Sequence, residues 1–328
     1  MERWGVAVTC VNLWVLGVAI VTTGLVAQET PHPNRLPWLS IFSEPLPEGV
    51  DQISLEGSNQ FLRTNRQDSP DGLAHAELEG EDWQITSDVA WALGPGRVNL
   101  RTRLTYRSAG FMDRAIMNWH DMLGVGQGGR DQVQTFLDAY HLDRNGVVVF
   151  DLRRPRLELQ GLDMAYVLPW GDKRRGGRLG GSIQIPTGHA EELQSSGGTN
   201  FMAGLGAWTT MGPLRFWAQG EDIWISLPQG SPLRQVVSRG QFWRAWAGAH
   251  YQGPGGGFLQ GFSLDLSYSY NETPYWTKLV RIDKYGAQQT WVFSHERLPK
   301  WRFGLTEKAG TFSAPEITFF TTYRFGES

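Results

Sequence analysis

Three arginines, Arg101, Arg103 and Arg107, share one parity of a single alternating segment. In a β-strand, side chains of one parity point to the same face. If Gly94 to Arg97 forms the preceding turn, Asp88 lies opposite Arg103 on that face. Such a row of guanidinium groups could attract anions into a pore. The arginines could instead form internal ion pairs. We favour this interpretation because an unpaired arginine in a closed interior is costly to desolvate.

The other candidates for lining or narrowing a pore come from later segments. Arg244 and Arg302 occupy the corresponding parity of their own segments, and Asp265 offers an acidic partner there. The full candidate set comprises Asp88, Arg101, Arg103, Arg107, Asp113, Trp119, His120, Arg130, Arg244, Asp265 and Arg302. Rings of charge in a pore choose among ions by field strength and width. The expected site is therefore a pore wall.

A short helix is predicted from Phe111 to Leu123, within the longest interruption of the alternation. One side of it would carry Phe111, Ala115, Trp119 and Met122. An apolar stripe in an external loop must be buried somewhere, and the mouth of a barrel is the nearest place. We therefore expect loop 110–130 to fold inward and narrow a pore. The alternative is a helix that caps the barrel for stability alone.

Other chemistries have weaker support in the sequence. His120 beside Asp121 could belong to a lipid-modifying enzyme, but no serine stands in a nucleophile-elbow context. Cys10 is the only cysteine, which excludes disulfide and zinc-finger frameworks. A net charge of −3 and a pI near 6.2 give no reason to expect nucleic acid as a partner. We expect no enzyme, no cofactor and no metal.

The elements that must position the candidate residues are strands with two different faces. In the hairpin 83–107 the residues Trp83, Ile85, Val89, Trp91 and Leu93 share one parity, while Gln84, Thr86 and Asp88 share the other. A second hairpin, 133–153, has an Asn145-Gly146 pair that favours a type I′ turn. A soluble sandwich would bury the apolar face, and an outer-membrane barrel would turn it to lipid.

Two further patterns favour the barrel. In the segment 258–270, aromatic residues stand at both ends and aliphatic residues in the middle, the order that a bilayer selects. Short connections near 95, 145, 174, 212, 255 and 298 alternate with mostly longer ones near 69, 120, 158, 192, 232, 278 and 311. The predicted fold is an all-β, single closed antiparallel transmembrane β-barrel of about 14 strands, or alternatively about 12.

The chain divides into four predicted regions. An apolar run after Arg3 indicates a signal peptide at 1–27, although an uncleaved anchor is the alternative. A proline-rich, irregular periplasmic leader follows at 28–50, then the outer-membrane β-barrel at 51–325 and a C-terminal tail at 326–328. This organisation places the protein in the outer membrane of a Gram-negative bacterium. Its expected partners are outer-membrane lipid and lipopolysaccharide, the barrel-assembly machinery during insertion and, in the case of transport, a small solute.

Several fragments resemble one known family. These are Ser108 to Asp113 with Ile116, His120 and Gly124 to Arg130; Gly161-Leu162-Asp163; Ile185-Pro186-Thr187-Gly188; and Glu307 to Phe325. They are similar to a bacterial outer-membrane β-barrel family catalogued as a domain of unknown function (family 3187), including its Gly-Leu-Gly-Asp strand opening and its Leu-Pro-Thr-Gly strand ending. The resemblance implies a fold and a location, and no particular activity.

Three functions follow from these observations. The first is a passive channel or uptake protein for a small solute, with its mouth narrowed by loop 110–130. The second is a plugged barrel with a structural or envelope-interaction role. The third is a lipid-modifying outer-membrane enzyme.

Overall fold

The structure is a computed structural model, and it describes most of the chain after residue 51. The described residues are 52–69, 71–108, 114, 117–118, 121–122, 124, 139–152, 156–172, 174–187, 197–235, 237, 240–253, 260–271, 286–298, 300–308 and 317–325. The predicted signal peptide at 1–27, leader at 28–50 and tail at 326–328 lie outside these residues. No helix within the described ranges is long and apolar enough to cross a membrane.

The described chain is built almost entirely of strands. They are β1 (Gln52–Asp68), β2 (Ala74–Leu93), β3 (Gly96–Ser108), β4 (Ala139–Arg144), β5 (Val147–Leu152), β6 (Arg156–Gly171), β7 (Arg175–Ile185), β8 (Asn200–Met211), β9 (Leu214–Trp224), β10 (Gln241–Gln252), β11 (Phe262–Asn271), β12 (Gly286–His295), β13 (Trp301–Lys308) and β14 (Ile317–Phe325). A 3₁₀ turn, η4 (Pro232–Gln235), lies between β9 and β10. The all-β prediction is confirmed.

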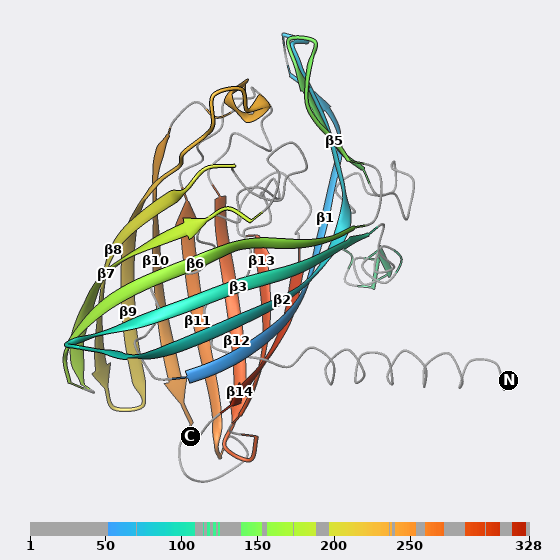
Figure 1. The fold of residues 1–328 in the computed structure, drawn as a ribbon. Helices are drawn as coiled ribbons and strands as arrows, with labels where there is room; N and C mark the ends of the chain where they lie inside the picture. Colours follow the sequence, from blue (N-terminus) through green and yellow to red (C-terminus); the bar gives the residue numbers. More distant parts are fainter. Residues whose placement is uncertain are drawn as a thin grey trace, which may run out of the picture.

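These strands form one antiparallel sheet (Figure 1). Its order is β1-β14-β13-β12-β11-β10-β9-β8-β7-β6-β3-β2-β4-β5, with an additional pairing of β1 and β2. Strand β1 therefore pairs with β14 along one edge and with β2 along the other. Strand β2 pairs with β3 over 81–93 and with β4 over 74–79. The hairpin β4–β5 thus continues the sheet beyond the end of β3.

The sheet exposes its apolar side chains and buries its polar ones. Leu266 is 44% exposed and Phe319 is 47% exposed, whereas Arg103 and Thr105 are almost fully buried. Charged residues are rarely buried in proteins unless they are paired, and a soluble sandwich buries its apolar face instead. The inverted burial is that of a membrane barrel, whose apolar face meets lipid and whose polar face is inside. The chain is therefore an outer-membrane protein.

Aromatic contacts lie at both ends of the later strands. Trp243 and Tyr270, near the ends of β10 and β11, have ring centroids 5.2 Å apart. At the opposite end of the sheet, Trp301 of β13 and Tyr323 of β14 have ring centroids 5.1 Å apart. Aromatic rings at both ends are what the two interfaces of a bilayer favour. The predicted order of aromatic and aliphatic residues is confirmed on these strands.

Two tight turns set the register of their hairpins. Asn145 and Gly146 have φ of 52° and 74°, the positive values of the type I′ turn predicted there. Gly94 has a φ of 58° and begins a two-residue turn, so Leu93 pairs with Gly96. The sequence prediction assumed a four-residue loop and paired Asp88 with Arg103. That register was wrong by two residues: Asp88 pairs with Arg101, although each residue keeps its predicted face.

The connections differ in length between the two ends of the sheet, as predicted, with two corrections. The turn at 145–146 lies beside the connection at 69–73, because the Asn145 amide donates a hydrogen bond to the Leu73 carbonyl 2.6 Å away. It therefore lies at the end with the longer connections, and not among the short turns. No turn forms near 158, because β6 already begins at Arg156 and continues through a bulge at Gly161.

Candidate functional site

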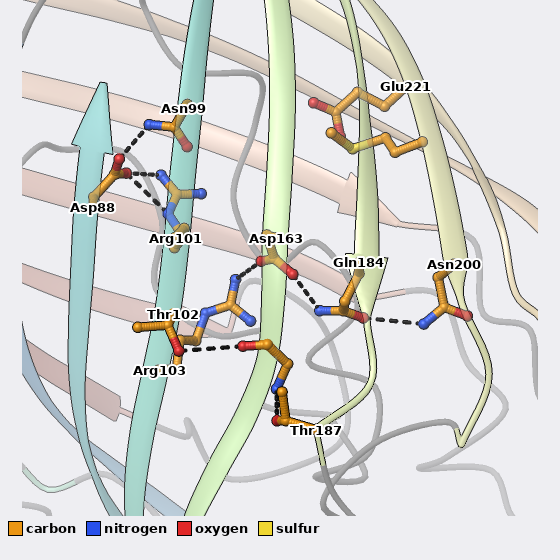
Figure 2. Close-up of polar contacts among 12 residues, drawn as sticks. Asp88, Asn99, Arg101, Thr102, Arg103, Asp163, Gln184, Thr187, Asn200 and Glu221 are labelled. Atoms are coloured by element: carbon orange, nitrogen blue, oxygen red, sulfur yellow. Dashed lines mark hydrogen bonds and ion pairs between the residues drawn. The ribbon is translucent and has the colours of Figure 1, made fainter. Parts of the chain in front are cut away.

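The first polar cluster lies where β2 and β3 pair. Asp88 is buried, and its carboxylate accepts hydrogen bonds from Arg101 at 2.5 and 3.0 Å. The Asn99 side-chain amide donates to the other oxygen of the same carboxylate. Figure 2 shows the three side chains converging from the two strands. Both Arg101 nitrogens donate to one Asp88 oxygen, and such charge-assisted hydrogen bonds are about twice as strong as neutral ones, so Arg101 is held as a structural cation.

The second cluster is a chain of contacts that crosses four strands (Figure 2). The Arg103 guanidinium lies 2.8 Å from an Asp163 oxygen, and the other Asp163 oxygen accepts a hydrogen bond from Gln184 at 2.7 Å. Gln184 in turn accepts from Asn200 at 3.1 Å, and Asn200 accepts from the Ser226 amide at 3.0 Å. The chain joins β3, β6, β7 and β8 to the segment that follows β9. Each strand contributes one member, so the chain ties these strands together on the buried face.

The bulge at Gly161 aims Asp163 into this chain. Gly161 has a φ of 58°. In the pairing of β3 with β6, Thr102 lies opposite Leu162 and the next residue, Arg103, lies opposite Gln160, so Gly161 is the extra residue of a β-bulge. Its amide donates to the Thr187 hydroxyl at 2.8 Å, and that hydroxyl donates to the Leu159 carbonyl at 2.8 Å. Two of the fragments that carried the family resemblance, 161–163 and 185–188, therefore meet through their own polar groups. Their role in the structure is to fix the bulge.

A third cluster lies farther along the same buried face. Arg178 donates to the Gln219 side-chain oxygen at 2.9 and 2.5 Å, and the Gln219 amide donates to Glu221. Arg244 lies 2.8 Å from Glu221 and 4.4 Å from the centre of the Trp246 ring. The Arg244 and Glu221 side chains are 5% and 0% exposed. Removing one partner of such a buried pair typically costs about 3–5 kcal/mol, because the other charge stays buried.

We call this region the filled wall, since long paired side chains occupy it. It consists of Arg103, Asp163, Arg178, Gln184, Asn200, Gln219, Glu221 and Arg244, and all of them are buried. Apolar side chains, Val167, Met202, Ile223, Ile225 and Phe242, form a buried cluster on the same strands and the segment after β9. The interior beside these strands is therefore packed.

A second region, which we call the open wall, has inward side chains that are half-buried, three of them serines. It consists of His250, Ser263, Asp265, Ser267, Ser294 and Arg302, which alternate with the exposed apolar residues of β10 to β13. His250 lies 2.8 Å from Asp265, and the two side chains are 30% and 13% exposed. The neighbouring Thr290 and Thr306 hydroxyls are buried and 2.9 Å apart.

The structure thus separates the predicted site residues into groups. Asp88 and Arg101 pair with each other; Arg103 and Arg244 belong to the filled wall, and Asp265 and Arg302 to the open wall. Arg107 lies in β3, but its side chain is outside the described part of the structure, as are Asp113, Trp119, His120 and Arg130. In loop 110–130, the described residues 114, 117, 118, 121 and 122 are helical. Met122 is 68% exposed, so this end of the predicted apolar stripe is not buried.

Several residues of the filled wall were missed by the sequence prediction. Asp163 was noted only as part of a family fragment, and Arg178, Gln184, Gln219 and Glu221 were not considered. The alternation of polar and apolar residues in β6, β7 and β9 could have identified them. In these strands polar residues alternate with exposed apolar residues as clearly as in β3.

The comparison with known families agrees with the resemblance seen in the sequence. The family described as "Protein of unknown function (DUF3187)" matches residues 70–219. The match confirms the resemblance over that range. It spans the bulge at Gly161 and the strands β2 to β8, so the DUF3187 region contains much of the filled wall and none of the open wall. No curated protein matches the chain by sequence.

Three of the solved structures that resemble this chain are described as an outer membrane channel, a porin and a toluene transporter. The COG4313 outer membrane channel from Pseudomonas putida F1 has 8% identity and a TM-score of 0.48, with 86% of this chain and 97% of that one covered. The NanC porin has 10% identity and a TM-score of 0.42, with 83% and 100% covered. The P. putida toluene transporter TodX has 10% identity and a TM-score of 0.38, with 89% and 92% covered. These similarities concern the fold, and they identify no solute for this chain.

Proposed function

We propose that the protein is a closed outer-membrane β-barrel that acts as a narrow passive channel for a small polar solute. Closure is supported by β1, which pairs with both β14 and β2. The strand order leads from β1 through β14 to β2, and β2 pairs with β1 again. Of the 14 strands, β4 and β5 lie outside this ring, which leaves 12 strands in it. A closed ring is also the arrangement that satisfies every strand edge in lipid.

The observation that carries the channel proposal is the difference between the two walls. Long side chains that pair with one another are buried along β3 to β10, which supports a packed interior on this side. The inward residues of β11 are serine and aspartate, and Ser263, Asp265 and Ser267 keep part of their surface accessible. The passage therefore runs along the open wall, and its polar lining favours a hydrophilic solute.

Selectivity in this proposal does not come from an arginine row. Arg101, Arg103 and Arg244 are each held by a carboxylate, and their charge is largely compensated. The groups placed to contact a passing solute are Arg302, Asp265 and its partner His250. Loop 110–130 forms the second part of the proposal: its helical segment narrows the mouth above this passage.

Planar-bilayer recording of the full-length protein tests the channel. We expect small, steady conductance that increases when residues 110–130 are replaced by a short glycine-serine linker. A conductance that is unchanged by the deletion rejects the role of the loop and leaves the channel in place. A silent barrel in both forms rejects the channel.

The alternative is a plugged barrel with a structural role, and the filled wall is the observation that favours it. It is distinguished by the same recording, because a plugged barrel stays silent. The lipid-modifying enzyme has no such support, since the residue that suggested it, His120, lies outside the described residues.

A further inference from the structure

A cluster of metal-ligating side chains lies on the hairpin that extends beyond the ring of strands. His75 of β2 pairs directly with Asp143 of β4, and His141 stands two residues before Asp143 on the same face. Asp151 of β5 pairs with His141 from the other side. Register alone therefore places two imidazoles and two carboxylates on one face of three adjacent strands.

The ligand atoms of three of these residues converge. One atom each from His75, His141 and Asp143 lies within 4.8 Å of the other two. His141 Nε2 lies 3.1 Å from Asp143 Oδ2. Two ligands of a tetrahedral zinc ion lie about 3.3 Å apart when each is about 2.0–2.1 Å from the metal. Side-chain rotation can therefore bring the three atoms to ligand spacing while the strands stay in place.

The second ring nitrogen of His141 lies near a carboxylate. Its Nδ1 atom lies 3.3 Å from Asp151 Oδ1, on the side opposite the contact with Asp143. Histidine ligands typically donate their other N–H group to a carboxylate, which fixes the tautomer and aims the lone pair at the metal. No hydrogen bond joins Nδ1 to Asp151, and Nδ1 is a buried polar atom without a hydrogen-bond partner. At 3.3 Å, a small rotation of the exposed Asp151 carboxylate would let it accept the Nδ1 proton and direct Nε2 towards His75 and Asp143.

We propose that His75, His141 and Asp143 form a binding site for one transition-metal cation, with Zn²⁺ the first choice. Two imidazoles and one carboxylate suit Zn²⁺, Ni²⁺ or Cu²⁺, whereas Ca²⁺ and Mg²⁺ prefer sites made of oxygen ligands. Three protein ligands leave a position for water, and all three residues are half-buried, so an ion can enter from solvent. Asp151 acts as a positioning residue. The site is independent of the proposed channel.

The bound cation would join β4 to β2 at the end of the hairpin. The same hairpin contacts the segment after β9, because Arg144 donates a hydrogen bond to the Gln235 carbonyl at 3.1 Å. A metal that fixes His141 and Asp143 against His75 therefore also fixes the position of Arg144 above η4. The expected consequence is a more rigid hairpin, which limited proteolysis can measure.

The test is a titration of the full-length, untagged protein in detergent with Zn²⁺, in which calorimetry measures the binding. We expect one Zn²⁺ per chain, and a visible tetrahedral spectrum when Co²⁺ replaces Zn²⁺. His141→Gln should abolish binding, and His75→Gln should weaken it by at least about 10-fold because one of three ligands is lost. Asp151→Asn should weaken it by about 10- to 100-fold, the usual effect of losing the carboxylate behind a histidine ligand.

His250→Gln is the matched control. His250 also contacts a carboxylate, Asp265, but lies on the barrel wall and outside the three-residue cluster. The His250→Gln variant should bind Zn²⁺ with the same affinity and stoichiometry as the wild type. The proposal is overturned if the wild type binds no Zn²⁺, or if His141→Gln and His250→Gln bind it equally. Each variant is first shown to keep the β-sheet circular-dichroism spectrum of the wild type, and His75→Gln provides a second test if His141→Gln does not fold.

Discussion

The filled wall and the open wall use the same alternation of residues with different results. Both turn polar side chains inward and apolar ones outward. On the filled wall the inward residues are long, and Arg103, Arg244 and Glu221 are buried by the partners they bind. On the open wall Ser263 and Ser267 are short and stay half-buried. The two walls therefore differ in how tightly their inward side chains are packed. Side-chain length alone does not explain the difference, because Ser182 and Ser269 are short and buried.

The largest loss of stability is expected when an ion pair of the filled wall is broken. Glu221→Gln removes the charge of the carboxylate that pairs with the buried Arg244 guanidinium, and should lower the free energy of unfolding by about 3–5 kcal/mol. Asp265→Asn is the matched change on the open wall, where His250 is more exposed, and should cost less than about 1 kcal/mol. Urea unfolding in lipid vesicles, followed by tryptophan fluorescence, measures both. Equal losses would mean that the two walls do not differ in packing.

The second expected effect tests the two faces of one strand. Leu264→Arg places a charge on the lipid face of β11 and should cost about 2–4 kcal/mol if it lies near the midplane of the bilayer. Ser263→Arg places the same charge on the half-buried inner face and should be far milder. The same unfolding assay compares them. A larger loss for Ser263→Arg would contradict the assignment of the faces.

The third concerns the bulge that aims Asp163 into the filled wall. Gly161→Ala puts a side chain at a φ of 58°, with its Cβ 3.2 Å from the Gln184 side chain, and should cost about 1–2 kcal/mol. Gly220→Ala is the control, because a Cβ added there meets nothing within 4 Å and its backbone φ is not in the left-handed region. No difference between the two would show that β6 accommodates the bulge without glycine.

The smallest effect is expected in the turn between β6 and β7. Hydrogen bonds from the backbone amides of Arg175 and Arg174, 2.9 and 2.7 Å long, lower the pKa of the Asp172 carboxyl. Because the folded pKa is below the unfolded one, the carboxylate contributes stability above the unfolded pKa, and that contribution is lost as the pH falls through the folded pKa. Asp172→Ala should lower stability slightly at neutral pH and not in strong acid. A difference that persists in strong acid would assign the effect to another cause.

The sequence predicted the faces of the strands better than their partners. The parity of Arg101 and Arg103, the exposure of Leu104 and Tyr106, and the turn at Asn145-Gly146 are confirmed, because each depends on neighbours in sequence. Inward folding of loop 110–130 stays a prediction, since most of that loop lies outside the described residues.

The partners of the buried charges depend on strand register, which alternation alone does not give. The pairing of Arg103 with Asp163 requires both the two-residue turn at Gly94 and the bulge at Gly161. The approach of His75 to His141 requires the hairpin β4–β5 to pair with the end of β2, whereas the turn near 145 had been expected among the short connections of the opposite end. A shift of two residues keeps every face and changes every partner.

The passage along the open wall is tested most directly by modifying a single cysteine in an open channel. In a Cys10→Ser background, Ser267→Cys lies on the open wall, and Ser182→Cys lies on the buried face of β7 beside the filled wall. A charged, membrane-impermeant thiol reagent should reduce the single-channel conductance of Ser267→Cys and leave that of Ser182→Cys unchanged. Equal modification of both cysteines, or conductance that does not respond at Ser267→Cys, would contradict a passage along this wall.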